Sequence, residues 1–171
     1  TSGDILVTAT NVTRKDWLVD DSGGLLYNVQ SGSGGLFGGA AAQSETTIIN
    51  QTGMKVGSGA VLSVTDQTDQ QGRLQLSVLN DVIARDQAKL DAGGAIAVAA
   101  AQSRIRNGDE DAGNQIPGDS ATIDIGTNAR LNALGDLTLA TRTKAIIEAN
   151  VDAKTYGLAG AAEGTTLASI S

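Results

Sequence analysis

The stretch NARLNALGDLTLAT, residues 128–141, decides the fold class of this protein. It ends in a glycine followed by a short run in which apolar and polar residues alternate, with Leu137 and Leu139 separated by Thr138. The chain contains three similar phrases: GDILVTA at 3–9, GRLQLSV at 72–78 and GAIAVAA at 94–100. Alternation with a period of two is typical of a β-strand with one buried face. We therefore predict an all-β protein.

Three stretches of nineteen residues align without a gap: TTIINQTGMKVGSGAVLSV (46–64), NDVIARDQAKLDAGGAIAV (80–98) and ATIDIGTNARLNALGDLTL (121–139). Four positions of this repeat are apolar in all three copies, and they form our predicted core ladder. Its members are Ile48, Val82 and Ile123; Val56, Leu90 and Leu131; Leu62, Ile96 and Leu137; and Val64, Val98 and Leu139. Internal repetition of this kind indicates a stacked architecture.

Short alternating strands in a repeat of irregular length predict a parallel β-solenoid. We expect about 20 residues in each coil and thus roughly eight coils, stacked at about 4.8 Å. The phrases would mark one strand of successive coils, with the glycine at a corner. A helix over 78–105, which is rich in Ala, Gln and Lys, is the alternative for that stretch. Its alignment with the strand-like copy at 121–139 disfavours the helix.

We interpret residues 1–171 as a single solenoid segment of a longer repetitive chain, with loop excursions near 31–45 and 106–120. The first of these stretches, SGSGGLFGGAAAQSE, has two interpretations. It is either a loop that carries Phe37 and a binding surface, or a strand of small residues packed against a neighbour. The second contains the chain's single proline and is predicted to be an exposed loop.

Composition excludes several classes of function. Cysteine and histidine are absent, which removes disulfides, thiolate metal sites and the commonest general base. A formal net charge of −7 disfavours nucleic acid and anionic lipid as partners. No apolar run approaches the ~20 residues of a membrane-spanning helix, so we expect no membrane insertion. The chain is predicted not to be an enzyme, because neighbouring carboxylates on a strand point to opposite faces.

Calcium is the one cofactor for which the sequence offers candidate ligands. The loop NGDEDAGNQIPGD (107–119) contains four oxygen donors: Asp109, Asp111, Asn114 and Asp119. It lacks the glycine and the bidentate glutamate of an EF-hand, so a solvated acidic loop is the favoured interpretation. Trp17, beside Lys15 and Asp16, is a candidate ligand contact, although a tryptophan that packs on its own loop is the commoner case.

The stretches ATIDIGTNARLNALGDLTLAT (121–141), NDVIARDQAKLDAGGAIAVAA (80–100) and GDILVTATN (3–11) resemble the repeat region of very large secreted bacterial proteins. These are the filamentous-haemagglutinin-like and leukotoxin-A-type filamentous adhesins of Gram-negative bacteria, including cyanobacteria. The resemblance implies a right-handed parallel β-helix, an extracellular or cell-surface location, and a role in adhesion or in a biofilm matrix. It implies no catalytic residues.

From these observations we expect a structural fibre, stalk or matrix element whose partners are neighbouring copies or adjacent repeats of the same chain. End-to-end assembly into filaments is part of this hypothesis, because unpaired strand edges favour further pairing. The alternative is an adhesin module that recognises a surface glycan or protein through its loops. An ice-binding solenoid is a third and weaker reading, because the threonines are too scattered to form regular ladders.

Overall fold

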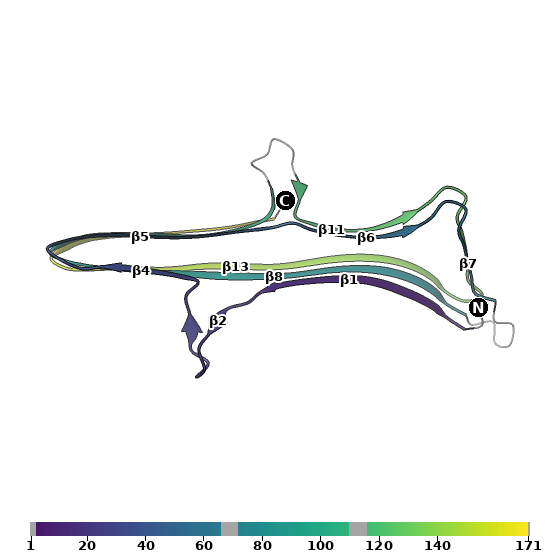
Figure 1. The fold of residues 1–171 in the computed structure, drawn as a ribbon, viewed down its shortest axis with the longest axis horizontal. Helices are drawn as coiled ribbons and strands as arrows, with labels where there is room; N and C mark the ends of the chain where they lie inside the picture. Colours follow the sequence, from purple (N-terminus) through teal and green to yellow (C-terminus); the bar gives the residue numbers. More distant parts are fainter. Residues whose placement is uncertain (1–2, 66–71, 110–115, 171) are drawn as a thin grey trace. The chain divides into compact units, whose positions relative to one another are not determined.

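The computed structural model describes residues 3–65, 72–109 and 116–170 (Figure 1). Every regular element in these residues is a β-strand, so the all-β prediction is confirmed and the helix over 78–105 is absent. The strands are β1 Ile5–Lys15, β2 Leu18–Val19, β3 Leu25–Leu26, β4 Val29–Ser33, β5 Phe37–Ile48, β6 Asn50–Val56, β7 Val61–Ser63, β8 Leu74–Gly93, β9 Ile96–Asp109, β10 Ile116–Pro117, β11 Asp119–Ile125, β12 Arg130–Asn132, β13 Leu137–Tyr156 and β14 Ala159–Ile170.

The long strands pair in parallel. β9 lies between β5 and β14, with Ile96 opposite both Phe37 and Ala159. β6 pairs with β11, β7 pairs with β12, and β4 pairs with β8, all in parallel. β8 lies between β1 and β13. Three side-chain hydrogen bonds tie residues in and beside β1 to residues in and beside β8, each joining residues 69 positions apart: Asp4 to Arg73, Thr8 to Ser77 and Asp16 to Arg85. A constant offset means that β1 and β8 are parallel.

We call residues 5–63, 74–132 and 137–170 the first, second and third layer, because strands of successive ranges pair with one another. Between the first two layers, paired residues are 69 positions apart at β1, 59 at β4 and β5, and 69 again at β6 and β7. The ten-residue changes locate one insertion in the first layer, around β2 and β3, and one in the second, between β9 and β11. Between the second and third layers the offset is 63.

Removing these insertions reveals a regular repeat. The link that follows the first layer, residues 64–73, has ten residues, whereas the link that follows the second layer, residues 133–136, has four. The first link therefore contains six further inserted residues. Equivalent residues of the first and second layers are 69 positions apart, and 16 of these positions are inserted residues, so 53 remain. Equivalent residues of the second and third layers are 63 positions apart, and ten of these positions are inserted residues, so 53 remain again. A 53-residue layer contradicts our prediction of about 20 residues in each coil and eight coils. The reason is that β8 and β13 alone run for 20 residues each without a break.

The glycine-led phrases begin strands rather than turn corners. GDILVTA, GRLQLSV and GDLTLAT begin β1, β8 and β13, which are neighbours in one sheet. Gly135 donates a backbone hydrogen bond to the carbonyl of Gly72, so equivalent glycines stack. GAIAVAA begins β9 in another sheet, and its alternation has the opposite phase, with Ala97 and Ala99 buried and Ile96 and Val98 exposed.

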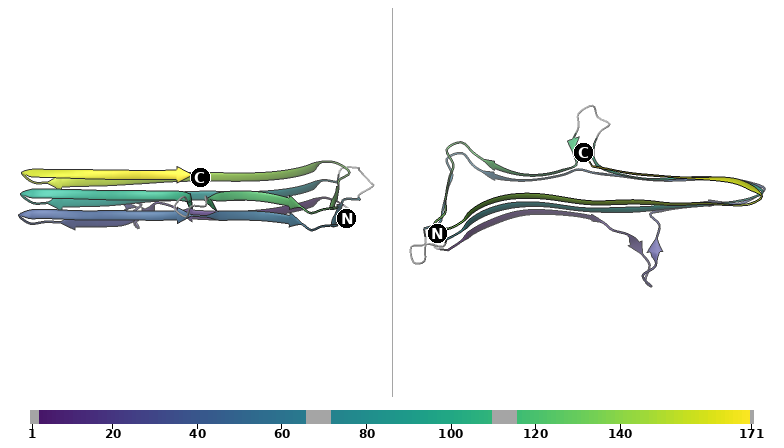
Figure 2. Two further views of the ribbon diagram at one scale, coloured as in Figure 1. Left: turned by 90° about the horizontal axis from the view of Figure 1, so that it is seen from above. Right: turned by 180° about the vertical axis from the view of Figure 1, so that it is seen from behind.

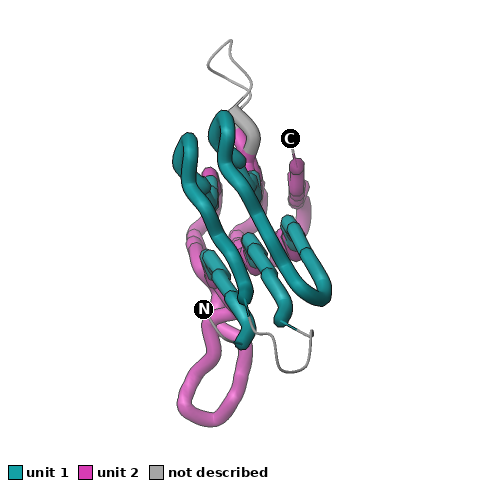
Figure 3. The backbone as a smooth tube through the Cα atoms, turned by 90° about the vertical axis from the view of Figure 1, so that its right-hand side faces the viewer, with its two compact units in different colours: residues 1–12, 50–81, 119–144 teal, residues 13–49, 82–118, 145–171 magenta. Residues whose placement is uncertain are grey.

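The chain divides into two compact units, coloured in Figure 3. Unit 1 comprises residues 1–12, 50–81 and 119–144, and its interior is aliphatic, with Val56, Val64, Leu74 and Leu76 buried. Unit 2 comprises residues 13–49, 82–118 and 145–171. Its interior consists mainly of small side chains: one cluster is formed by Ala42, Leu90, Ala92, Ala97, Ala99 and Ala101, and another by Ile48, Val82, Ala84 and Ile105.

The twelve residues of the predicted core ladder have three kinds of environment. Buried are Ile48, Val56, Val64, Val82 and Leu90; half-buried are Leu62, Ile123 and Leu131; exposed are Ile96, Val98, Leu137 and Leu139. The predicted columns also differ from the observed register. Val56 pairs with Ile125 rather than Leu131, because the gapless alignment between 46–64 and 121–139 is shifted by six residues from the true offset.

Strands β4 and β5 occupy the stretch near 31–45, where we expected a loop excursion. Of the two interpretations of this stretch, the structure has the strand of small residues. Ala40 and Ala42 turn toward the interior because only small side chains fit there. In the other expected excursion, 106–120, β10 pairs antiparallel with the end of β9, Ile116 opposite Asp109. A further excursion, the hairpin of β2 and β3, is not among those expected from the sequence.

Candidate interaction site

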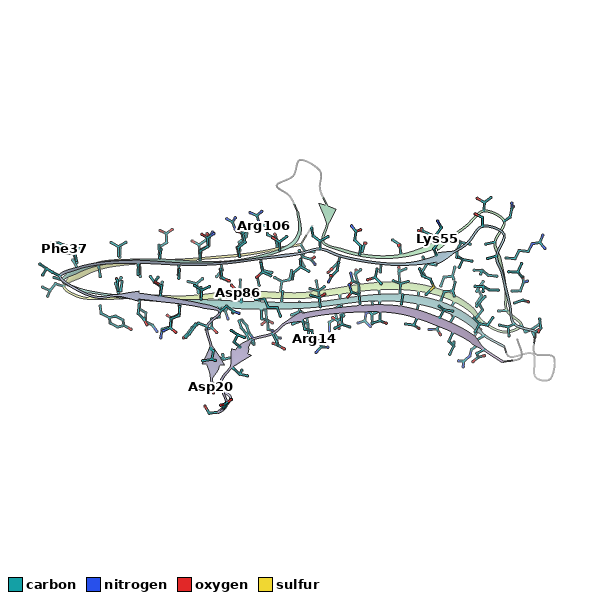
Figure 4. All side chains as sticks on the ribbon, in the orientation of Figure 1. Arg14, Asp20, Phe37, Lys55, Asp86 and Arg106 are labelled. Atoms are coloured by element: carbon teal, nitrogen blue, oxygen red, sulfur yellow. The ribbon has the colours of Figure 1, made fainter. Side chains whose placement is uncertain are left out.

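A short hairpin, residues 17–27, leaves the β4–β8 sheet of unit 2 and projects away from it; we call it the arm (Figures 1 and 4). Its two strands pair antiparallel, with Leu18 opposite Leu26 and Val19 opposite Leu25. The turn DDSGG (20–24) is held by Asp20, whose Oδ1 accepts hydrogen bonds from the backbone N–H of Ser22 (2.9 Å) and of Gly24 (2.7 Å). The side-chain hydroxyl of Ser22 donates to the same oxygen, and these bonds lower the pKa of Asp20.

The aliphatic side chains of the arm face solvent. Leu18, Val19, Leu25 and Leu26 are 44–57% exposed. Because paired residues point to one face and their neighbours to the other, both faces of the arm are apolar. A two-stranded hairpin without a packed face is marginally stable in water, so this arrangement calls for an anchor at its root or a partner at its faces.

An aromatic residue anchors each strand of the arm to β8. The Arg85 guanidinium lies 5.9 Å from the centroid of the Trp17 ring, and Lys89 Nζ lies 5.2 Å from that of Tyr27. Arg85 also bridges Asp16 (2.7 Å) and Glu148 (3.0 Å), and its hydrogen bond lowers the pKa of Asp16. These contacts hold the root at one place on the sheet.

The arm returns to the sheet register at Asn28. Its N–H donates to the carbonyl of Gln87 (2.8 Å), and its side-chain oxygen accepts from the N–H of Gln87 (2.8 Å). A sequence signal for the arm exists: in WLVDDSGGLLY (17–27), an aromatic residue and two aliphatic residues stand on each side of a turn. Of this arm, only Trp17 is among the residues that we singled out from the sequence.

An ion pair of unit 2 joins Lys15, whose side chain is 33% exposed, to Asp86, whose side chain is fully buried and points into the interior (Figure 4). Lys15 Nζ is 2.7 Å from Asp86 Oδ1 and donates a second bond to Thr46 Oγ1 at 2.6 Å. Ser103 donates to the other carboxylate oxygen of Asp86 at 2.6 Å. Burial raises the pKa of Asp86, but hydrogen bonds from Lys15, Ser103 and Ser44 outweigh it and hold this pKa below its usual range. The carboxylate is therefore ionised and matched by a cation.

A shallow depression of about 310 Å³ lies on the outer face of the sheet formed by β5, β9 and β14. It is centred on Ala41 and Ala100, which pair with each other and whose small side chains leave room beside larger residues on three strands. Its rim is formed by Gln43, Gln102, Glu163 and Thr165. On one side along the sheet lie the exposed side chains of Phe37, Ile96 and Val98; on the other lie Glu45, Arg104 and Arg106.

The predicted calcium ligands are only partly described. Asp111 and Asn114 lie outside the described residues, as does the side chain of Asp109. Asp119 is half-buried at the start of β11, where its Oδ1 accepts a hydrogen bond from Asn80 Nδ2 at 3.3 Å. Within the described part of the chain, no group of three or more acidic side chains is placed to hold a metal ion.

Comparisons with protein-family models, with curated proteins and with solved structures gave no match to this chain. None of the elements described in residues 3–65, 72–109 and 116–170 is a helix long and apolar enough to cross a membrane.

Proposed function

We propose that this chain is a segment of an extracellular, non-catalytic fibre or stalk, built as a right-handed parallel β-solenoid. The handedness and the location follow from the resemblance to filamentous adhesins. The solenoid itself is supported by the 53-residue advance that separates equivalent residues of successive layers once insertions are removed. A chain that advances by a constant number of residues in parallel register extends by adding layers.

The observation that carries the proposal is the burial of equivalent leucines. In the second layer, Leu74 and Leu76 are 0% and 1% exposed. Their counterparts 63 residues later, Leu137 and Leu139, are each 49% exposed, because β13 has one neighbour, β8, among the described strands. A further layer on β13 would bury these side chains, and complete burial of one leucine contributes about 1.5–3 kcal/mol. Each layer thus stabilises the next, as a fibre requires.

The alternative, an adhesin module that binds a glycan, has less support from the site geometry. Sugar rings stack on free aromatic faces, whereas Trp17 and Tyr27 each hold a cation over one face of the ring. Both residues are also half-buried at the root of the arm. A glycan would have to displace Arg85 or Lys89 to reach them.

Duplication of one layer tests the proposed solenoid. A second copy of residues 74–136 inserted after Asp136 should add one complete layer in register. We expect a higher free energy of unfolding in urea, a steeper dependence on urea concentration, and unchanged circular dichroism per residue. The control is an insertion of the same 63 residues in scrambled order. This insertion should lower both the free energy of unfolding and its dependence on urea concentration. A duplicated chain that is no more stable than the original would contradict the proposal.

A further inference from the structure

We propose that the open edge of β13 accepts a further layer with the charge pattern of the second layer, with Arg or Lys opposite Asp136 and Glu148, and selects against a second copy of this chain. This inference rests on the proposed function, because it names the kind of layer that follows β13 in the fibre. β13 forms one edge of the sheet in which β8 lies between β1 and β13 (Figure 2).

A charged side chain of the second layer interacts with the layers on both of its sides. Arg85 bridges Asp16 of the first layer (2.7 Å) and Glu148 of the third (3.0 Å). Arg73, just before β8, is paired with Asp4 at 2.8 Å. The hydrogen bond with Asp4, the charge of Asp4 and, to a smaller extent, the charge of Asp136 raise the pKa of Arg73. Each of these two cations therefore lies between acids of both neighbouring layers.

The charged residues along β13 form one outward row. Ala145, Ile147 and Ala149 pack toward the interior, so the even-numbered residues point outward. All charged residues between positions 136 and 154 belong to this row: Asp136, Arg142, Lys144, Glu148, Asp152 and Lys154. The second-layer residues 63 positions earlier are, in the same order, Arg73, Leu79, Asp81, Arg85, Lys89 and Asp91. Five of these six positions have opposite charges in the two layers, and the sixth sets Arg142 opposite a leucine.

An added layer with the pattern of the second layer would repeat these pairs on the other side of β13. Residues in register on parallel strands carry their side chains on the same face, beside one another. The added layer would therefore place a cation beside Asp136, Glu148 and Asp152 and an acid beside Lys144 and Lys154. Opposite charges at such positions favour pairing, and like charges oppose it.

A second copy that stacked its first layer on β13 would place acids beside acids. The offsets of 69 and 63 positions add to 132, so Asp4 would meet Asp136 and Asp16 would meet Glu148. Arg14 would meet Ile146, equally far along the strand from a lysine and from a glutamate. The other charged residues of the row, Arg142, Lys144, Asp152 and Lys154, would meet Thr10, Val12, Gln30 and Gly32. No opposite charge in register compensates for the two acidic contacts.

The edge of β14 does not change this preference. Glu163 is the one charged residue of this strand, and it is in register with Ala100 of the second layer. Ala100 in turn pairs with Ala41 of the first layer. Either kind of layer would thus place an alanine beside Glu163, so the row on β13 decides which layer fits.

Two peptides test the charge pattern on the whole chain. The first has the sequence of residues 72–93 with D86A, because the third layer has Ala149 at this position; the second differs from it only by R73D and R85E. Both would add to the edge of β13 as a parallel strand. We expect the first peptide to bind wild type at least about tenfold more tightly in fluorescence anisotropy, and the difference to shrink at high salt.

The chain variant D136R/E148R locates the binding site. Asp4 and Asp16 still pair with Arg73 and Arg85 in this variant, so its circular dichroism should match that of wild type. It should bind the acidic peptide more tightly than the first, by a similar factor. The control D21R/D124R makes the same change in net charge at exposed positions away from β13 and should keep the preference of wild type. Equal affinities for the two peptides, no binding of either, or a preference that D136R/E148R does not reverse would overturn the inference.

Self-association gives a second measurement. In D136R/E148R the new arginines would meet Asp4 and Asp16 of another copy, so sedimentation equilibrium should show association at least about tenfold stronger than for wild type or D21R/D124R. Wild type that associates as strongly as D136R/E148R would overturn the selection against a second copy. The two peptides have the same apolar residues and test charge alone, whereas the layer duplication tests the burial of apolar side chains. A duplication that stabilises the chain while both peptides bind alike would leave the fibre standing and remove the charge selection.

Discussion

Lys15 and Asp86, 71 residues apart in the sequence, form an ion pair of 2.7 Å in which the aspartate side chain is fully buried. Lys15 ends β1 in the first layer, and Asp86 lies in β8 of the second. Ser103 of β9 donates to the same carboxylate, so the pair also joins facing sheets of unit 2. A polar contact of this kind fixes the register between strands that otherwise present small, similar side chains.

Replacing Lys15 by Met should destabilise the protein by about 3 kcal/mol, because it leaves the Asp86 carboxylate buried without its cation. The double variant K15M/D86L should lose less than K15M alone, since it removes the unpaired charge as well. Urea unfolding of wild type, K15M, D86L and K15M/D86L measures the coupling free energy between Lys15 and Asp86. Additive effects would mean that the two residues do not interact in solution.

The same pair should make stability depend on pH. Hydrogen bonds hold the pKa of Asp86 lower in the folded chain than in the unfolded chain. Its ionisation therefore stabilises the folded state above about pH 4, the ordinary carboxyl value, and this contribution is lost as the pH falls further. We expect the difference in unfolding free energy between wild type and D86N to shrink from pH 7 to pH 3. A difference that stays constant would argue against this pairing.

Gly94 should not tolerate a side chain. Its φ is +156°, and a Cβ atom there would lie 2.4 Å from the backbone carbonyl oxygen of Gly35 in the layer below. Gly94→Ala should therefore destabilise by about 1–3 kcal/mol. Gly39→Ala is the matched control, because a Cβ atom at Gly39 meets nothing within 4 Å. Equal thermal midpoints for the two variants would contradict the tight stacking of this turn.

Neighbouring residues of β9 should respond in opposite ways to substitution. Ala99 is buried among the alanines of unit 2, so Ala99→Leu should overpack this interior and cost about 1–3 kcal/mol. Val98 points outward and is exposed, so Val98→Thr should change stability by no more than about 0.5 kcal/mol. Chemical denaturation of both variants tests which residues of β9 point toward the interior. A neutral Ala99→Leu would show that the interior has spare room.

Much of the candidate site was within reach of sequence reasoning. Trp17 was recognised as a candidate contact, and the mirrored pattern around DDSGG would have indicated the arm. The depression could not be predicted, because it depends on Ala41 and Ala100 meeting across 59 residues of chain. The partners of Asp86 could not be predicted either: the alternation places Asp86 in phase with the inward Val82 and Leu90, but Lys15 and Ser103 lie on other strands.

The sequence by itself determined the β-strands and the repetition, because alternation of apolar residues and glycine-led strand starts are local properties of the chain. The tertiary structure alone decided the length of a layer, the register and the inward face of β9. A strand of alternating small residues is compatible with either face and with many registers. The choice is made where distant segments meet, through the space left by facing alanines and through buried polar groups such as Asp86, which is paired with Lys15 and Ser103.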